Sequence, residues 1–235
     1  MGQSEKKPVH HCTFRFEKKL IEQGYYRIAG VDEVGRGALC GPVVAAAVIF
    51  HGRPPVRGIN DSKKLTPDQR EKLKPKIVKN ALCCGIGIVS AEEIDRINIY
   101  QATLKAMRLA LEQLSPQPDF VLIDGTRVNG LSVANLNLVK GDARCLSIAA
   151  ASIVAKVTRD HLMQSYASMY PMYDWDHNKG YACKSHFHAL REHGPVSFHR
   201  RSFKPIHEDN QLLLDEKIEI ISPDSGLHSV QISTD

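Results

Sequence analysis

The 235-residue chain has no long hydrophobic run, no internal repeat and no low-complexity segment. A helix that spans a bilayer needs about 20 consecutive apolar residues, and no stretch of this sequence approaches that length. The first residues include lysine and histidine but no apolar core, so the pattern of a secretory signal peptide is absent. We therefore expect a cytoplasmic protein.

Cysteine occurs six times, but no two cysteines have the C-x-x-C spacing of zinc or redox motifs. Lasting disulfides are rare in the reducing cytoplasm. We expect six reduced packing residues: Cys12, Cys40, Cys83, Cys84, Cys145 and Cys183.

Aromatic residues make up only 6% of the chain, whereas the hydrophobic fraction of 43% is that of an ordinary globular protein. Charge is unevenly distributed. The whole chain has a net charge of +5. Residues 205–235 hold seven acids and one lysine, a net charge of −6, so residues 1–204 carry a net charge of +11. A basic body favours a polyanionic partner. The densest basic and aromatic region, 179–204, is the candidate nucleic-acid surface and includes Lys179, Lys184, Arg191, Arg200, Arg201 and Lys204.

The most informative motif is DEVGRG at 32–37, which follows the mostly apolar segment 26–31. Successive side chains of a regular strand point to opposite faces, so Asp32 and Glu33 can meet at one site only where a strand ends or bulges. The two glycines allow such an irregular turn. They also leave backbone N–H groups open to a sugar or a phosphate.

Two further acids follow other apolar or alternating segments. Asp124 ends the run 120–123, and Asp142 follows the run 133–139. Acids from separate elements can meet over one edge of a sheet, where they repel one another unless divalent cations neutralise them. Oxygen ligands favour Mg²⁺ or Mn²⁺ over zinc. The pattern predicts a carboxylate site for two-metal phosphodiester cleavage.

Eight motifs resemble, in order and spacing, those of bacterial ribonuclease HII, a type 2 ribonuclease H. Eight ordered motifs are far more specific than any one of them, and the resemblance spans roughly residues 25–205. The motifs are DEVGRG at 32–37, GPVVAAAV at 41–48, DSKKLT at 61–66, LIDG at 122–125, KGD at 140–142, AASIVAKVTRD at 150–160, NKGY at 178–181 and HRRSFKP at 199–205.

The resemblance implies a role for each matching residue. Four carboxylates, Asp32, Glu33, Asp124 and Asp142, would be catalytic and would hold two Mg²⁺ or Mn²⁺ ions around the scissile phosphate. A glycine-arginine-glycine turn would read the 2′-hydroxyl of a ribonucleotide through its backbone. A tyrosine would pack on the deoxyribose side of an RNA–DNA junction, and two lysines would contact backbone phosphates, with a solvated turn as the alternative. These substrate-binding residues are Gly35, Arg36, Gly37, Tyr181, Lys63 and Lys64.

The order of expected elements fits a ribonuclease H-like α/β fold with a five-stranded mixed sheet flanked by helices. A tight Gly41-Pro42 link favours an antiparallel pair, and helical crossovers favour parallel pairing. Capping boxes are predicted at Thr66 and Ser90. The expected strands are 26–32, 42–50, 83–89, 119–124 and 133–139, and the expected helices are 66–80, 98–114 and 144–168.

We expect three segments along the chain. Residues 1–24 form an N-terminal extension, and residues 25–205 form the catalytic domain, which includes a helical substrate-binding region at about 170–205. Residues 206–235 form an acidic tail that is either disordered or binds a partner, since Leu214, Ile218 and Ile221 have helical spacing.

Two other sets of residues are given structural roles. Asp160 lies about five helical turns from Asp142, so we expect an ion pair with Lys156 or Arg159. The histidines of the region 186–199 have no companion acids or cysteines in zinc-site spacing, so we expect a solvated or phosphate-facing role. They are His186, His188, His193 and His199.

The resemblance implies an endonuclease that hydrolyses the RNA strand of RNA–DNA hybrids and cuts 5′ of single ribonucleotides in duplex DNA. Three alternatives remain. Ribonuclease HIII usually has a threonine where this chain has Arg36 and carries an extra N-terminal domain. A DNA nuclease of the same fold lacks the glycine-arginine-glycine turn. A non-catalytic nucleic-acid-binding module would be weakened by four acids that repel phosphate.

Overall fold

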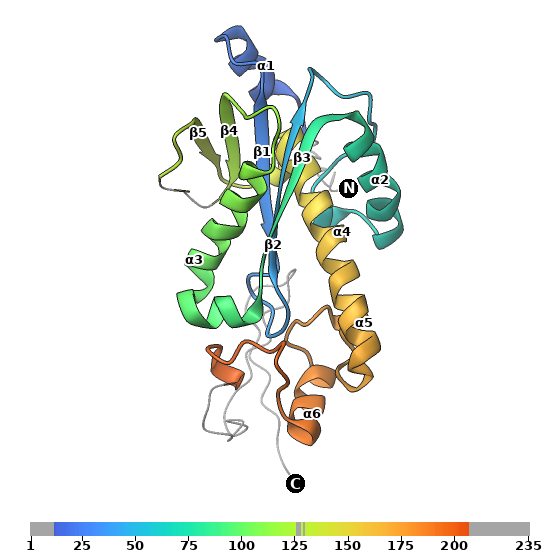
Figure 1. Cartoon of the computed structure of the whole chain (residues 1–235). Helices are drawn as coiled ribbons and strands as arrows, with labels where there is room; N and C mark the ends of the chain where they lie inside the picture. The colour runs from blue at the N-terminus through green and yellow to red at the C-terminus, as the bar shows by residue number, and fades with distance from the viewer. Residues whose placement is uncertain (1–11, 126–127, 129, 207–235) are drawn as a thin grey trace, which may run out of the picture.

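A computed structural model describes residues 12–125, 128 and 130–206. Its centre is a five-stranded sheet with the strand order β3-β2-β1-β4-β5 (Figure 1). The first three strands form an antiparallel meander, β4 is parallel to β1, and β5 is parallel to β4. The expected mixed sheet is confirmed. The strands are β1 (Ile28–Val34), β2 (Val43–Phe50), β3 (Ala81–Val89), β4 (Phe120–Asp124) and β5 (Ala134–Leu138).

The connections between the parallel strands follow the expectation. The crossover from β3 to β4 is helical. The described residues between β4 and β5, which are 125, 128 and 130–133, form no helix, and none of the expected helices falls there. The expected acidic tail lies outside the described residues apart from Ile206, as do residues 1–11 of the expected extension.

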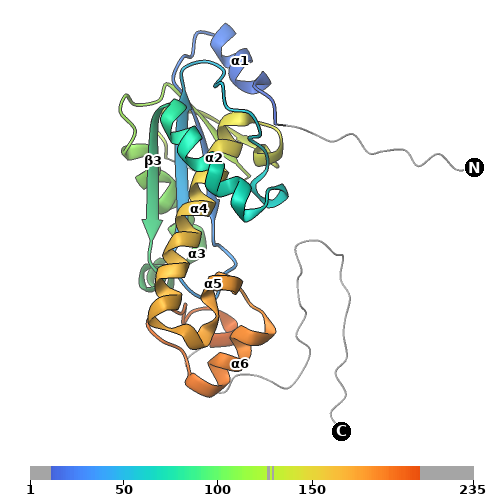
Figure 2. The ribbon, with the colours of Figure 1, turned by 90° about the vertical axis from the view of Figure 1, so that its right-hand side faces the viewer.

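Helices cover both faces of the sheet. Helix α3 (Ala91–Glu112) packs on one face, while α4 (Leu146–Met169) packs on the other with α2 (Pro67–Asn80) beside it (Figures 1 and 2). Every residue of β2 is buried, which explains why this strand is uniformly apolar rather than alternating. A Cβ atom on Gly87 of β3 would lie 1.9 Å from the carbonyl oxygen of Ala106, so glycine is what lets α3 approach the sheet closely.

The predicted helix starts are largely confirmed. Thr66 and Gln69 form a complete capping box on α2. The Ser90 hydroxyl accepts from the backbone N–H of Glu93, but the Glu93 carboxylate pairs with Arg96 and Lys105 instead of closing the second box. The helix expected from residue 98 begins at a kink inside α3, where Asn98 has φ of 66° and its side chain accepts from the Gln101 N–H.

Smaller elements lie beyond the two ends of the sheet. The helical C-terminal region packs around the buried Trp175 at one end, and α1 (Arg15–Glu22) lies toward the other (Figures 1 and 2). In the described residues no helix is both long and apolar enough for a membrane span. The C-terminal region comprises η3 (Pro171–Tyr173), α5 (Trp175–Asn178), α6 (Lys184–His193) and η4 (Lys204–Ile206).

Two of the four histidines are buried in this C-terminal region, contrary to the expected solvated role. The Val196 N–H donates to His199 Nδ1, so the proton of neutral His199 is on Nε2, 3.1 Å from His186 Nε2. His186 Nε2 therefore accepts, also from the Trp175 indole at 3.2 Å, and His186 Nδ1 donates to the Tyr181 carbonyl at 3.0 Å. These partners favour one tautomer for each ring, and a further proton would place two donors face to face.

This histidine pair predicts an acid-sensitive stability. Burial, reinforced by the neighbouring His186, lowers the pKa of His199 to about 3. The unfolded chain has an ordinary histidine pKa near 6.5 and binds more protons than the folded chain below that value, so stability falls as the pH decreases. We expect the wild type to lose about 2 kcal/mol more than His199→Gln between pH 7 and pH 5 in urea unfolding. An equal loss in both proteins would contradict this role of His199.

Candidate active site

Two catalytic candidates lie side by side because of the pairing between β1 and β4. The strands are parallel, and Val31 lies opposite Ile123. The next residues, Asp32 and Asp124, are therefore neighbours at the carboxyl ends of the paired segments, with their side chains on the same face.

Asp142 joins them from the turn that precedes α4. This turn, η2 (Gly141–Ala143), is tied to β4 because the Gly141 N–H donates to Asp124 Oδ1 at 2.6 Å. The Ala143 N–H donates to Asp142 Oδ1 at 2.9 Å. Ligand oxygens of Asp32, Asp124 and Asp142 all lie within 4.8 Å of one another. We call these three residues the carboxylate group.

Glu33 does not belong to this group. We expected β1 to end or bulge at the two acids, but its pairing with β2 continues in regular register through Glu33 and Val34. The pleat therefore starts the Glu33 side chain on the opposite face from Asp32, but its charge still raises the pKa of Asp32 around the end of the strand. There its Oε1 lies 3.4 Å from Arg36 Nη1, while Oε2 is buried and has no hydrogen-bond partner among the described residues.

Burial and like charge disfavour ionisation of Asp32 and Asp142. Desolvation raises the pKa of Asp32 well above its ordinary value, and the charges of Glu33, Asp124 and Asp142 raise it further. Burial also raises the pKa of Asp142, together with the charge of Asp124, although the Lys63 ammonium opposes this shift. Cations bound between these acids would lower the raised pKa values and restore the ionised carboxylates.

The residues present fit divalent cations. The carboxylate group offers oxygen ligands only, which suits Mg²⁺ or Mn²⁺ rather than zinc. The unpartnered Oε2 of Glu33 is a further buried oxygen beside it, and burial raises the Glu33 pKa against the lowering effect of Arg36. Asp32, Asp124 and Asp142 would hold the cations, with Glu33 as the adjoining acid.

The glycine-arginine-glycine turn is held from beneath by Arg200. The Arg200 guanidinium is fully buried and donates to the carbonyl oxygens of Gly35, Arg36 and Gly41 at 2.7–3.0 Å. Gly35 has φ of 93°, and a Cβ atom there would lie 2.2 Å from Arg159 Nε. The expectation that Arg200 belongs to the nucleic-acid surface was wrong, because its donors are consumed by the turn.

A second buried arginine, Arg159, links Tyr181 to this turn. The Arg159 guanidinium lies 5.3 Å from the centre of the Tyr181 ring and donates to the carbonyl oxygens of Cys40, Pro42 and Lys179 at 2.9 Å. Arg159 thus ties the chain on both sides of the turn to the loop that carries Tyr181.

The two predicted lysines differ in their surroundings. Lys63 is exposed, and its ammonium lies 3.9 Å from Asp142 Oδ2, at the rim of the carboxylate group. Lys64 is exposed in the same turn, η1 (Ser62–Lys64). The structural role expected for Asp160 is confirmed by its ion pair with Lys156 at 2.8 Å. Arg159, the alternative partner, bonds backbone carbonyls instead.

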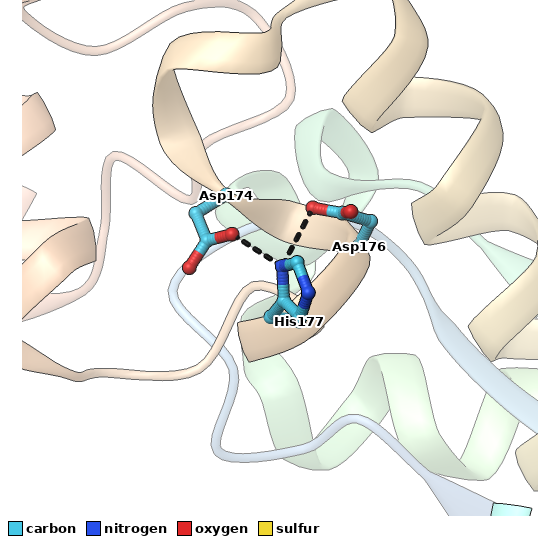
Figure 3. A group of neighbouring side chains, drawn as sticks. All are labelled: Asp174, Asp176 and His177. Carbon is cyan, nitrogen blue, oxygen red and sulfur yellow. Dashed lines mark hydrogen bonds and ion pairs between the residues drawn. The ribbon is translucent and has the colours of Figure 1, made fainter.

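A second cluster of possible metal ligands lies at the start of α5. His177 Nδ1 is 2.6 Å from Asp174 Oδ1 and 3.3 Å from Asp176 Oδ1 (Figure 3). The hydrogen bond to Asp174 and the charge of Asp176 raise the pKa of this exposed histidine. These mutual contacts account for the cluster as an ion-paired turn.

The sequence interpretation missed the two buried arginines as supports of the site. For Arg159 a signal exists: Ser152, Ala155, Arg159 and Met163 recur at helical spacing, and all four are buried on one face of α4. An arginine on such a face must find partners in the interior. Arg200 has no comparable local pattern.

Solved structures share this architecture. The crystal structure of ribonuclease H2 from Pyrococcus horikoshii OT3 has a TM-score of 0.66 and 26% sequence identity, covering 77% of this chain and 95% of that one. That of Bst-RNase HIII in complex with Mn²⁺ shares the fold, with a TM-score of 0.56 and 19% identity over 72% of this chain and 63% of that one. The mixed sheet and these structural neighbours therefore define a protein with the ribonuclease H-like fold.

The sequence comparisons identify the family. The model of the Ribonuclease HII family matches residues 29–206. Ribonuclease HII from Geobacillus sp. (strain WCH70) is 52% identical over 194 residues, which are 83% of this chain and 70% of that protein. The chain belongs to the ribonuclease HII family and is a metal-dependent hydrolase of the endonuclease type.

The carboxylate group predicts a trade between stability and metal binding. Asp124→Asn removes one of three mutually repelling charges but keeps an oxygen acceptor for the Gly141 N–H. We expect the metal-free variant to be as stable as the wild type or more stable, by about 1 kcal/mol, because functional sites commonly cost stability. It should also lose most cleavage activity.

Thermal unfolding with and without Mn²⁺ checks this prediction. Added Mn²⁺ should raise the Tm of the wild type more than that of Asp124→Asn, since a ligand stabilises only the state that binds it. A variant that cleaves at the wild-type rate, or that loses activity only because it unfolds, would remove Asp124 from the metal-binding role.

Proposed function

We propose that this protein hydrolyses the RNA strand of RNA–DNA hybrids and cuts 5′ of a single ribonucleotide in duplex DNA. Its products would carry 5′-phosphate and 3′-hydroxyl ends. The observation that carries the proposal is the carboxylate group, Asp32, Asp124 and Asp142, in a chain of the ribonuclease HII family. An oxygen-only cluster in which burial and repulsion raise pKa values is suited to cations that also bind substrate phosphate.

Two divalent ions bound there would activate the attacking water and stabilise the departing 3′ oxygen. The chain's own residues set up this site. Asp32 is fixed on β1, Asp124 is oriented by the Gly141 N–H, and Asp142 is oriented by the Ala143 N–H. The Lys63 ammonium at the rim would meet a backbone phosphate, and Lys64 would extend that contact along the strand.

The turn Gly35-Arg36-Gly37 would supply the recognition of the 2′-hydroxyl. Arg200 binds the carbonyl oxygens of Gly35 and Arg36. Because trans peptide groups are planar, the following N–H groups, those of Arg36 and Gly37, point away from Arg200. Backbone groups presented in this way can contact a ribose closely, and the 2′-hydroxyl is what distinguishes RNA from DNA.

The proposed partners are RNA–DNA hybrids and duplex DNA that contains ribonucleotides, and a role in replication and repair would place the protein in the cytoplasm. We assign catalysis to residues 25–205 and substrate contact to the helical region at about 170–205. A non-catalytic binding module remains the weaker candidate, because three acids at the site would repel phosphate.

Substrate choice is the first test. A labelled DNA duplex with one internal ribonucleotide should be cut directly 5′ of that ribonucleotide with Mg²⁺ or Mn²⁺, and not with EDTA. An all-DNA duplex is the control and should stay intact. If only runs of several ribonucleotides are cut, the specificity resembles that of ribonuclease HIII and the proposed junction reading is wrong.

The role of Tyr181 can be tested separately. Tyr181→Ala should slow cleavage at a single ribonucleotide by about tenfold, because an aromatic packing contact is worth about 0.5–1.5 kcal/mol. Binding of the duplex should change less than the rate. Tyr181→Phe keeps the ring over Arg159 and should remain close to wild type. Equal rates for Tyr181→Ala and wild type would remove Tyr181 from the site.

A further inference from the structure

The described N-terminal residues contact the turn that carries Asp142, although they precede the region 29–206 that matches the family model. Residues 12–17, which we call the N-terminal brace, run alongside residues 142–147. Thr13 forms a parallel bridge with Cys145. Its N–H donates to the Arg144 carbonyl, and its own carbonyl accepts from the Leu146 N–H, both at 3.2 Å.

The brace also reaches the backbone of the catalytic candidate itself. The Cys12 thiol donates to the carbonyl oxygen of Asp142 at 3.0 Å. At the other end of the same stretch, the Arg144 guanidinium lies 5.2 Å from the centre of the Phe16 ring. Contacts on both sides of Asp142 restrict how far this turn can move relative to the sheet.

Glu17 is the strongest contact of the brace. Only 2% of this residue is exposed. Its Oε1 accepts from the Ser147 N–H and the Ser147 hydroxyl, each at 2.8 Å, and from the Cys145 thiol at 3.1 Å. Among the described residues, Glu17 forms no salt bridge with a basic side chain. The hydrogen-bond donors of Ser147 and Cys145 take the place of a counterion.

These contacts make Glu17 a cap for α4 that comes from a distant segment. The first amides of a helix have no partner inside the helix, and a carboxylate there is favoured by the helix dipole. Cys145, which occupies the N-cap position, forms no side-chain capping bond. Glu17 supplies the missing acceptor for the N–H of Ser147, the second residue of α4.

We propose that the N-terminal brace is a positioning element of the metal site, and that Glu17 and Cys12 are its positioning residues. The turn with Asp142 is held on one side by Asp124, which accepts from the Gly141 N–H, and on the other side by the brace. Residues that orient a metal ligand affect metal affinity without touching the metal. This inference rests on the proposed role of Asp142 as a metal ligand.

The test uses the full chain and measures the Mn²⁺ concentration that half-saturates cleavage, together with the rise in Tm caused by Mn²⁺. Glu17→Ala should raise the half-saturating concentration roughly tenfold, as expected for loss of a group that orients a ligand. It should also reduce the rise in Tm. Glu17→Gln keeps an Oε1 acceptor for Ser147 and should restore most of the wild-type metal response.

Glu22→Ala is the matched control, because Glu22 is a carboxylate on the same helix that is exposed and pairs only with Lys18 among the contacts described. Its metal response should equal that of the wild type. If Glu17→Ala does not fold, Cys12→Ala carries the test. Loss of its weak hydrogen bond to the Asp142 carbonyl should raise the half-saturating concentration about threefold.

Asp142→Asn, measured in parallel, separates the proposed metal role of Asp142 from the proposed positioning role of the N-terminal brace. An unchanged Mn²⁺ response in Asp142→Asn would show that the proposed metal role of Asp142 is wrong. If Asp142→Asn responds as expected but Glu17→Ala and Cys12→Ala keep the wild-type response and merely lower the metal-free Tm, the brace is only structural and the inference is overturned.

Discussion

Mutual repulsion among three carboxylates, two buried and one half-buried, is the constraint on which the rest of this structure depends. Asp32, Asp124 and Asp142 come from two strands and a turn, yet their oxygens lie within 4.8 Å of one another. Such an arrangement is unfavourable without cations, and only a rigid surrounding body can impose it. Parallel pairing of β1 with β4 fixes the first two acids, and the backbone amides of the turn before α4 offset part of the negative charge.

The surrounding body meets this constraint by linking segments that are far apart in the sequence. The small residues of α4 let it lie directly on β1 and β2, and the residues before it join the sheet to the N-terminal brace. At the carboxyl end of β1, Arg200 and Arg159 connect the glycine-arginine-glycine turn to the C-terminal helical region. The carboxylate group and the glycine-arginine-glycine turn are thus built on one continuous framework rather than on independent loops.

Much of this framework could be predicted because its signals are local. Capping residues located the starts of α2 and α3, and acids at strand ends identified the carboxylate group. Local patterns could not predict the register that separates Glu33 from Asp32, since the strand continues where the glycines favour an end. Nor could they place Arg200 or His199, because a basic, aromatic segment looks alike whether it faces water or the interior.

The two buried arginines have an electrostatic consequence for the surface above them. Arg159 and Arg200 bond carbonyl oxygens rather than carboxylates, so neither positive charge is neutralised by a bonded acid. Burial lowers the pKa of Arg200 to about 9, with the charge of Arg159 adding to the shift, which leaves it charged at neutral pH. Dissolved salt screens surface lysines strongly but interior charges much less. Beneath the turn, therefore, part of the attraction for a polyanionic strand should persist at ionic strengths that abolish the contribution of exposed side chains.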